Sequence, residues 1–283
     1  MSRSCHASHL ACTPVLPVTL IVIAKNEAPV IGRCLDSVPF AADKVVVDSG
    51  SMDGTADIAA AHGARVVHQQ WLGFGPQRNF ATGVAKHDWI LVLDADEQLS
   101  PALAAELERR LPSIMESSLA GAHFRRATRF MGKAMRWYRP MSGERIARLY
   151  HRERARWSDK RVHESLQFKG AVTSFRERLL HDHNPTLVHR HIKMLRYTEL
   201  RAQDWHERGR KVRMWLCPLV FITTFLKDYW LRLAFLDGWR GYIVAQTAAS
   251  YAVYKRLRYY ELDVDPSSAA LASELLRKHG LEP

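Results

Sequence analysis

The chain has 283 residues, enough to bury a substantial hydrophobic core as one large domain or as one domain with an extension. Its formal net charge is +12, and residues 121–214 supply the excess because they hold 24 Lys and Arg against 9 Asp and Glu. These numbers exclude a short peptide module. They indicate a polyanionic partner, which could be a nucleic acid, an anionic lipid surface or a phosphorylated substrate.

The amino-terminal residues and the cysteines bear on the compartment. Residues 1–17 lack the continuous apolar core of a secretory signal, so we expect a flexible amino-terminal segment and a cytoplasmic protein. The cysteines, which are Cys5, Cys12, Cys34 and Cys217, show neither metal-ligand spacing nor a compact disulfide pattern. They are interpreted as free thiols in a reducing compartment.

Short apolar runs alternate with helix-like stretches through the first 110 residues. Strands are expected at 18–24, 44–48, 64–68 and 89–94. Between them, helices are expected from Pro29 to about Val38, from about 54 to 62 after an Asp53 cap, and after the Gly-rich passage 73–76; a further helix begins at Ser100 and Pro101. This order predicts an α/β fold with a mostly parallel sheet, covered by helices on both faces, and ligands beyond the carboxyl ends of its strands.

The run Trp89–Asp94 continues into Ala95, Asp96 and Glu97, so a buried strand ends in three carboxylates. In extended backbone, residues two apart project to the same face. We therefore expect Asp94 and Asp96 to converge on one hard divalent cation while Glu97 points elsewhere. An ordinary polar turn is the competing interpretation.

The pattern changes after residue 121. Arg-rich strand candidates at 122–126 and 145–151 give way to helical stretches after Pro185. Two apolar runs, 215–226 and 242–254, are too short to span a bilayer as helices. Their interleaved Trp, Tyr, Arg and Lys residues favour either a helical surface in the membrane interface or an ordinary buried helical pair.

Four segments occur in an ordered arrangement: Ile23–Glu27, Asp48–Thr55, Gln77–Asn79 and Leu93–Glu97. Together they resemble the signature of family 2 glycosyltransferases, which have a GT-A fold. Later segments, Arg148–Tyr150, Val162–Glu164 and Leu236–Gly238, resemble the bacterial branch that builds the lipopolysaccharide core. The resemblance covers about residues 18–260. It divides the chain into a catalytic domain at 18–184, with a nucleotide-sugar half (about 18–120) and an acceptor half (about 121–184), and a helical extension at 185–283.

The resemblance implies binding of a nucleotide-diphosphate sugar donor at the strand ends. The residues expected to contact it are Ala24, Lys25, Asn26, Glu27, Asp48, Ser49, Gly50, Asp53, Arg78, Asn79, Asp94 and Ala95. Asp48 would accept hydrogen bonds from the base or ribose, and Arg78 would bind phosphate oxygens or the base. Helix capping is the alternative role for Asp53, and a solvated helix face is the alternative for Arg78.

The resemblance also implies a metal-dependent, inverting enzyme. Asp96, with Asp94, would hold Mg²⁺ or Mn²⁺, which stabilises the departing nucleoside diphosphate. The acceptor hydroxyl needs a base on the opposite side of the sugar. Glu164 is the candidate for that base and Asp159 is the alternative, while His163 could orient the acceptor or complete the metal shell. His181, Asp182 and His183 have ligand-like chemistry, but capping of a following helix is the preferred interpretation, and they receive no catalytic role.

The basic middle region is expected to receive a phosphorylated glycolipid of the lipid A inner-core type. Its candidate acceptor-binding residues are Arg125, Arg126, Arg129, Lys133, Arg136 and Arg139. The protein would then sit peripherally on the cytoplasmic face of the inner membrane.

Two other classes compete with this hypothesis. A nucleic-acid-binding protein could use the basic region, but the charge lies outside the motif-bearing half and no nucleic-acid module is recognised, so we expect no nucleic acid partner. A sugar-1-phosphate nucleotidyltransferase would share the sheet and the carboxylate-bound metal, but its Gly-rich opening loop is missing after residue 24.

Overall fold

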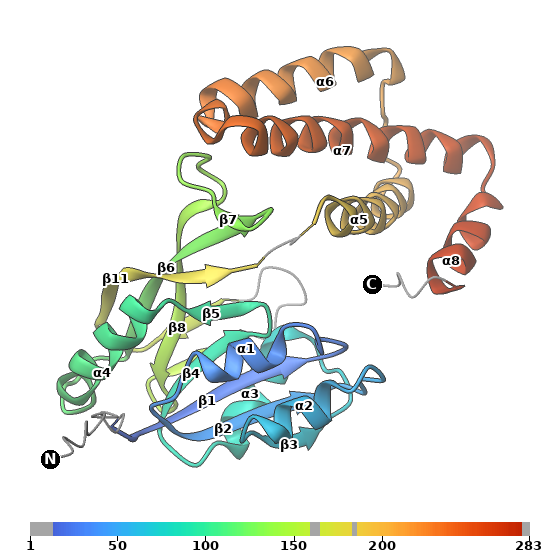
Figure 1. Ribbon diagram of the computed structural model, residues 1–283. Helices are drawn as coiled ribbons and strands as arrows, with labels where there is room; N and C mark the ends of the chain where they lie inside the picture. Colours follow the sequence, from blue (N-terminus) through green and yellow to red (C-terminus); the bar gives the residue numbers. More distant parts are fainter. Residues whose placement is uncertain (1–13, 159–164, 183–185, 279–283) are drawn as a thin grey trace, which may run out of the picture. The chain divides into compact units, whose positions relative to one another are not determined.

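The computed structural model describes residues 14–158, 165–182 and 186–278 (Figure 1). The described chain forms two compact units. The first contains residues up to Arg125 and then Arg145–His181, and the second contains Arg126–Glu144 and the residues from Asp182 onward. The first unit is therefore built from two segments of chain that are separated by an insertion.

Four parallel strands form one half of the main sheet, in the order β3-β2-β1-β4. Their bounds are Leu16–Ala24 (β1), Ala41–Asp48 (β2), Arg65–His68 (β3) and Trp89–Asp94 (β4). In this register Ala24 lies opposite Asp48, and Ile23 lies opposite Asp94. The expected strands are confirmed, and the polar segments that follow β1, β2 and β4 begin at one edge of the sheet.

Helices cover both faces of this half, as the alternation of apolar residues in β1 requires. Val18, Leu20 and Val22 belong to one core cluster, and Ile21 and Ile23 belong to another. Figure 1 shows α1 and α2 on one face and α3 on the other. The helices are Ile31–Asp36 (α1), Thr55–Ala61 (α2), Phe74–Val84 (α3) and Pro101–Met115 (α4). The start expected for α4 is confirmed: Ser100 accepts a hydrogen bond from Leu103 N–H, and Pro101 occupies the first turn.

A buried carboxylate ties the amino-terminal ends of these elements together. Asp43 accepts two hydrogen bonds from Arg65, each of 2.9 Å, and others from Thr19 Oγ1 and Lys86 N–H, each of 3.1 Å. Burial alone would raise the pKa of Asp43, but the hydrogen bonds from Arg65 and Lys86 outweigh it and lower the pKa. The ionised form therefore stabilises the contact of β2 with β3 and with the loop before β4.

The other half of the sheet continues in the order β4-β8-β6-β11-β5, with β8 antiparallel to β4 and β5 antiparallel to β11. Its strands are Glu97–Leu99 (β5), Gly121–Phe130 (β6), Ser142–His151 (β8) and Val172–His181 (β11), and the short strand Lys133–Ala134 (β7) pairs with β6. A separate two-stranded sheet is formed by Ala155–Trp157 (β9) and Leu166–Phe168 (β10). The Arg-rich strand candidates are thus confirmed as parts of β6 and β8. Gly121 allows the close packing here, since a Cβ there would lie 2.3 Å from the Leu149 carbonyl oxygen.

Helices make up most of the second unit, as expected after Pro185. They are α5 (Leu187–Glu207), α6 (Cys217–Leu226), α7 (Gly238–Val264) and α8 (Ser268–Lys278), with short 3₁₀ or π turns at Met214–Leu216 (η1), Lys227–Leu231 (η2) and Ala234–Asp237 (η3). Figure 1 shows α7 between α5 and α6. Gly241 allows α7 to pack closely against η3, because a Cβ added at Gly241 would lie 1.6 Å from the Ala234 carbonyl oxygen. No helix of the described chain combines the length and the apolar character needed to cross a bilayer.

Candidate active site

The loops after β1 and β2 bind each other through the side chain of Asn26, which the sequence predicted to meet a ligand, and through that of Ser51. Asn26 N–H donates to Ser51 Oγ at 2.9 Å, and Met52 N–H donates to Asn26 Oδ1 at 2.9 Å. Asn26 has a left-handed backbone, with φ of 58°, which asparagine tolerates better than most residues. The two loops, residues 25–28 and 49–53, therefore form one surface at the carboxyl edge of the sheet, which we call the ledge.

Asp53 contributes to the same ledge in a way that differs from the expected helix cap. Its Oδ2 accepts from Ala28 N–H at 3.0 Å, and its Oδ1 accepts from Thr55 N–H at 3.1 Å. The residue that caps α2 is Gly54, and Thr55 Oγ1 accepts from Glu27 N–H at 2.8 Å. Asp53 thus joins the start of α2 to the loop after β1.

Asp48, at the end of β2, is buried beneath this ledge with 1% of its surface exposed. Its Oδ2 accepts from Gly50 N–H at 3.1 Å and from Ser51 N–H at 3.0 Å, and its Oδ1 bonds the Ser51 hydroxyl. Burial would raise the pKa of Asp48, but the hydrogen bonds from Ser51 and Gly50 lower it. The carboxylate is therefore ionised, and it fixes the shape of the Ser49–Gly50–Ser51 turn.

Helix α3 supplies three polar side chains, all bound to neighbouring segments. Gln77 Nε2 donates to Ser49 Oγ at 3.0 Å, which links α3 to the turn after β2. Asn79 exchanges two hydrogen bonds with the Trp157 backbone, of 3.0 and 3.1 Å. The Arg78 guanidinium carbon lies 4.5 Å from the centroid of the Trp157 ring, a cation–π contact. Asn79 thus positions the strand that carries the ring beneath Arg78.

The carboxylates after β4 are arranged differently from the expectation. The chain turns at residues 95 and 96, so the two-residue alternation of a strand stops at Asp94. Arg148, from β8, donates through the same Nη2 to Asp94 Oδ2 at 2.5 Å and to Glu97 Oε1 at 2.7 Å. Glu97 Oε2 also accepts from Asp94 N–H at 3.1 Å. The prediction that Glu97 points away from Asp94 is therefore wrong.

Asp94 lies between two arginines. Its Oδ1 accepts from Arg78 Nη2 at 2.7 Å, and its Oδ2 accepts from Arg148. Burial would raise the pKa of Asp94, but the positive charges of Arg148 and Arg78 hold it well below its usual range. Burial, with the Asp94 charge, raises the pKa of Glu97. The group is thus an ionised aspartate held by two buried guanidinium groups, and we call Arg78, Asp94, Glu97 and Arg148 the arginine clamp.

Asp96 has a different partner. Its Oδ2 lies 3.2 Å from His181 Nε2, at the end of β11, in a register that places His181 opposite Glu97. The side chain of Asp96 is 29% exposed, whereas that of His181 is 8% exposed. Residue spacing could not have paired them, because β5 and β11 are far apart in the sequence. His181 is therefore a candidate site residue to which the sequence assigned no catalytic role.

The Asp96–His181 pair fits part of a divalent-metal site. A carboxylate oxygen and an imidazole nitrogen are both metal donors, and Mg²⁺ or Mn²⁺ bound to a diphosphate commonly has only one or two protein ligands. Within the described residues no group of three or more His, Cys, Asp and Glu side chains gathers as a metal site. An ion here would therefore take its remaining ligands from substrate and water.

The remaining predicted residues lie in several places. Lys25, Ser49 and Gly50 belong to the ledge, and Ala95 is buried in the turn after β4. The predicted base Glu164, its alternative Asp159 and the neighbouring His163 lie outside the described residues. Their assignment stays a prediction.

The six acceptor candidates lie along the basic segment from β6 onward. Arg126 pairs with Glu144, and Arg129 Nε lies 3.5 Å from Asp182 Oδ1. The other four are exposed: Arg125, Lys133, Arg136 and Arg139. Of the six, Arg125 belongs to the first unit and the others to the second.

A sheet with a parallel half, whose clustered carboxylates and arginines lie beyond the carboxyl ends of its strands, is the arrangement of an α/β protein that binds a ligand at that edge. Residues 19–175 match the family described as Glycosyl transferase family 2, and the chain belongs to that family. This membership confirms the sequence resemblance and decides against the nucleotidyltransferase alternative.

Known relatives are similar along most of the chain. The lipopolysaccharide core biosynthesis glycosyltransferase LpsC of Rhizobium meliloti (strain 1021) is 31% identical over 264 residues, which cover 88% of this chain and 93% of LpsC. An uncharacterized glycosyltransferase of Rickettsia felis is 29% identical over 251 residues, covering 85% of this chain and 88% of its own. Among solved structures, mannosyl-3-phosphoglycerate synthase from Rubrobacter xylanophilus is 20% identical, with a TM-score of 0.41, covering 70% of this chain and 76% of that chain.

Proposed function

We propose that the protein transfers a sugar, with inversion, from a nucleotide-diphosphate donor to a hydroxyl of a phosphorylated glycolipid during lipopolysaccharide core assembly. The observation that carries the proposal is the convergence of the ledge, the arginine clamp and the Asp96–His181 pair at one edge of a GT-A sheet. The similarity to LpsC, which spans most of both chains, supports the choice of acceptor class.

Each group has a physical role in this reaction. The ledge offers backbone and side-chain hydrogen bonds to the nucleoside, and its geometry is held by the ionised Asp48. The arginine clamp holds Arg78 rigid over Trp157, so that its planar donor face is organised before the diphosphate arrives. Preorganised positive charge favours the developing negative charge of the leaving diphosphate.

Asp96 and His181 would hold a divalent cation. Such an ion, when bound, acts as a Lewis acid toward the leaving diphosphate. Asp94 is the weaker metal candidate in this arrangement, because both of its carboxylate oxygens accept hydrogen bonds from arginines. Its role in the proposal is to position Arg78 and Arg148.

The acceptor is a membrane lipid in this proposal, and the second unit carries a surface suited to a membrane interface. Trp215, Leu219, Ile222, Leu226 and Trp230 are spaced by three or four residues through η1, α6 and η2, and between 47% and 73% of each is exposed. This spacing gathers side chains on one side of a helix. We call these five residues the α6 face.

Basic residues near the α6 face in the sequence are exposed too. They are Lys211, Arg213 and Lys227. Tryptophan and leucine beside lysine and arginine suit a surface that inserts shallowly into an anionic bilayer. Peripheral attachment to the cytoplasmic face of the inner membrane is therefore part of the proposal.

Mass spectrometry of lipopolysaccharide from a strain lacking this protein tests the function. The expected result is the loss of a single hexose or heptose from the core, which would also identify the transferred unit. Purified protein should then restore that unit to the truncated glycolipid when the matching nucleotide sugar is supplied. An unchanged core would contradict the proposal.

Vesicle flotation tests the membrane part. The protein should float with vesicles containing anionic lipid and much less with neutral vesicles. A Leu219→Ser, Ile222→Ser double variant should float less, whereas Leu271→Ser, which alters an exposed leucine of α8, should not. Equal flotation with anionic and neutral vesicles would refute electrostatic docking.

A further inference from the structure

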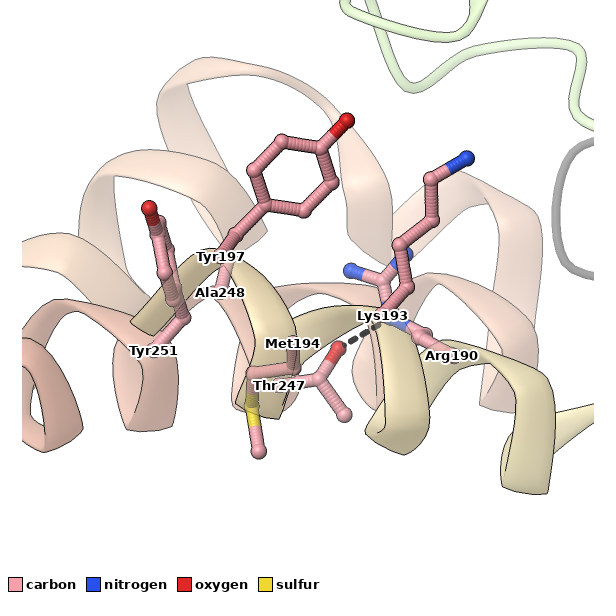
Figure 2. A pocket seen from close by; sticks show the side chains of 7 residues that line it. All are labelled: Arg190, Lys193, Met194, Tyr197, Thr247, Ala248 and Tyr251. Carbon is pink, nitrogen blue, oxygen red and sulfur yellow. Dashed lines mark hydrogen bonds between the residues drawn. The ribbon is translucent and has the colours of Figure 1, made fainter. Parts of the chain in front are cut away.

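The second unit contains a cavity of about 350 Å³ between α5 and α7. Arg190, Lys193 and Tyr197 line it from α5, and Thr247 and Tyr251 line it from α7 (Figure 2). Ligand cavities in proteins begin at about this size. None of these residues belongs to the strand-end site of the first unit.

Arg190 brings a positive charge to the wall of the cavity, and the groups it contacts there are neutral. Its Nε donates to Thr247 Oγ1 at 2.5 Å, and its Nη2 donates to the Val244 carbonyl oxygen at 3.3 Å. Its guanidinium carbon lies 5.6 Å from the centroid of the Phe130 ring. These contacts fix the guanidinium in place without neutralising its charge.

The surroundings of Arg190 also disfavour its charged form. Burial lowers the pKa of Arg190, although Tyr138 and Asp228 act in the opposite direction. Asp228 forms its ion pair with Arg232, at 2.8 Å. A half-buried cation of this kind gains from an anion that enters the cavity beside it.

Lys193 adds a second cation, and two tyrosines add ring surfaces. Arg190, Lys193 and Tyr197 follow one another at intervals of three and four residues, which places them on one side of α5. Figure 2 shows Lys193, Tyr197 and Tyr251 extending toward the same side of the helix pair. A tyrosine ring has an apolar face and a polar hydroxyl, which together match the C–H face and the hydroxyl edge of a pyranose.

We infer that this cavity binds a sugar phosphate ester, with the phosphate against Arg190 and Lys193 and the sugar ring against Tyr197 and Tyr251. The shared chemistry could come from a phosphorylated sugar of the glycolipid acceptor or from a free sugar phosphate. The first source rests on the function proposed above. The binding of a sugar phosphate ester by this cavity is independent of that function.

Direct binding tests the site, with glucose 6-phosphate, glucose and inorganic phosphate as separate probes in calorimetry or ligand-observed NMR. Arg190 also joins α5 to α7 through Thr247 and Val244, so its substitution could disturb the helix pair. Lys193→Gln and Tyr197→Ala are therefore the test variants, and Arg201→Gln removes one exposed charge from the same helix as a control. We expect the Kd of glucose 6-phosphate to rise at least about fivefold in each test variant and to stay within about twofold in the control. Lys193→Gln removes one charge-assisted hydrogen bond to the phosphate, and Tyr197→Ala removes a ring face that packs against the sugar. Glucose and phosphate should bind more weakly than the ester.

Two results would overturn the inference. One is the same Kd in Lys193→Gln, Arg201→Gln and the unaltered protein, and the other is no detectable binding of glucose 6-phosphate.

Acceptor kinetics distinguish the two sources. If the ester belongs to the glycolipid, Lys193→Gln should raise KM for the phosphorylated acceptor, leave KM for its enzymatically dephosphorylated form unchanged and leave the KM for the donor unchanged. If only the binding of the soluble ester changes, the cavity is a site for a free sugar phosphate. A protein that binds glucose 6-phosphate but transfers no sugar from any nucleotide donor would retain this site and refute the proposed function.

Discussion

Replacing Asp94 by Asn should destabilise the first unit, because the two buried arginines then lose their shared charge partner. Removing one member of a buried ion pair costs about 3–5 kcal/mol. The Asp94 side chain keeps 30% exposure, and Asn retains one acceptor oxygen, so the lower end of that range, about 3 kcal/mol, applies here. At about 2–4 °C per kcal/mol for a domain of this size, Tm should fall by about 6–12 °C.

Replacing Asp96 by Asn is the matched control two residues away. Its side chain is 29% exposed and lies against His181 rather than an arginine, so its loss should cost no more than about 1 kcal/mol. Asp96→Asn should instead weaken the apparent affinity for Mn²⁺ at least about tenfold. Thermal unfolding and turnover across a Mn²⁺ titration measure both effects. If Asp94→Asn melts no lower than Asp96→Asn, the division of roles between the two aspartates is wrong.

Three further predictions concern the stability of the protein at low pH, the proposed catalytic base Glu164 and the packing of the helical second unit. Because the pKa of Asp43 is lowered in the folded state, its contribution to stability is complete above about pH 4 and is lost as pH falls below that value. Asp43→Asn should therefore lower stability at pH 7 and flatten the fall in the urea midpoint between about pH 4 and 2; an unchanged slope would contradict this. Glu164→Gln should abolish turnover and retain nucleotide binding by calorimetry, and near-normal turnover would eliminate Glu164 as the base. Gly241→Ala should lower the free energy of unfolding by at least about 1–3 kcal/mol, because the added Cβ clashes with Ala234. Gly83→Ala, which has open space around it, should leave that free energy unchanged or raise it slightly. Thermal unfolding of both variants measures the difference.

The first half of the fold was predictable because its signals are local. Buried parallel strands appear as continuous apolar runs, and Ser100 followed by Pro101 marks the start of α4 by itself. The Arg-rich strands were found for the same reason, although β6 and β8 extend beyond the expected ends.

The site was predictable only in part, because its partners lie far apart in the chain. Asp94 meets Arg148 54 residues later, and Asp96 meets His181 across the pairing of β5 with β11. The alternation rule failed at Glu97 because the chain turns after Asp94, which the competing interpretation of a polar turn allowed. Only the strand order of the sheet brings these side chains together.

The arginine clamp has a consequence for how the polypeptide is synthesised. Glu97 lies in the earlier of the two segments that build the first unit, and Arg148 lies in the later one. A growing chain leaves the ribosome from its amino terminus, so the Glu97 carboxylate is made before the Arg148 guanidinium that pairs with it. The nascent chain therefore cannot close this part of its interior until the intervening insertion has been translated.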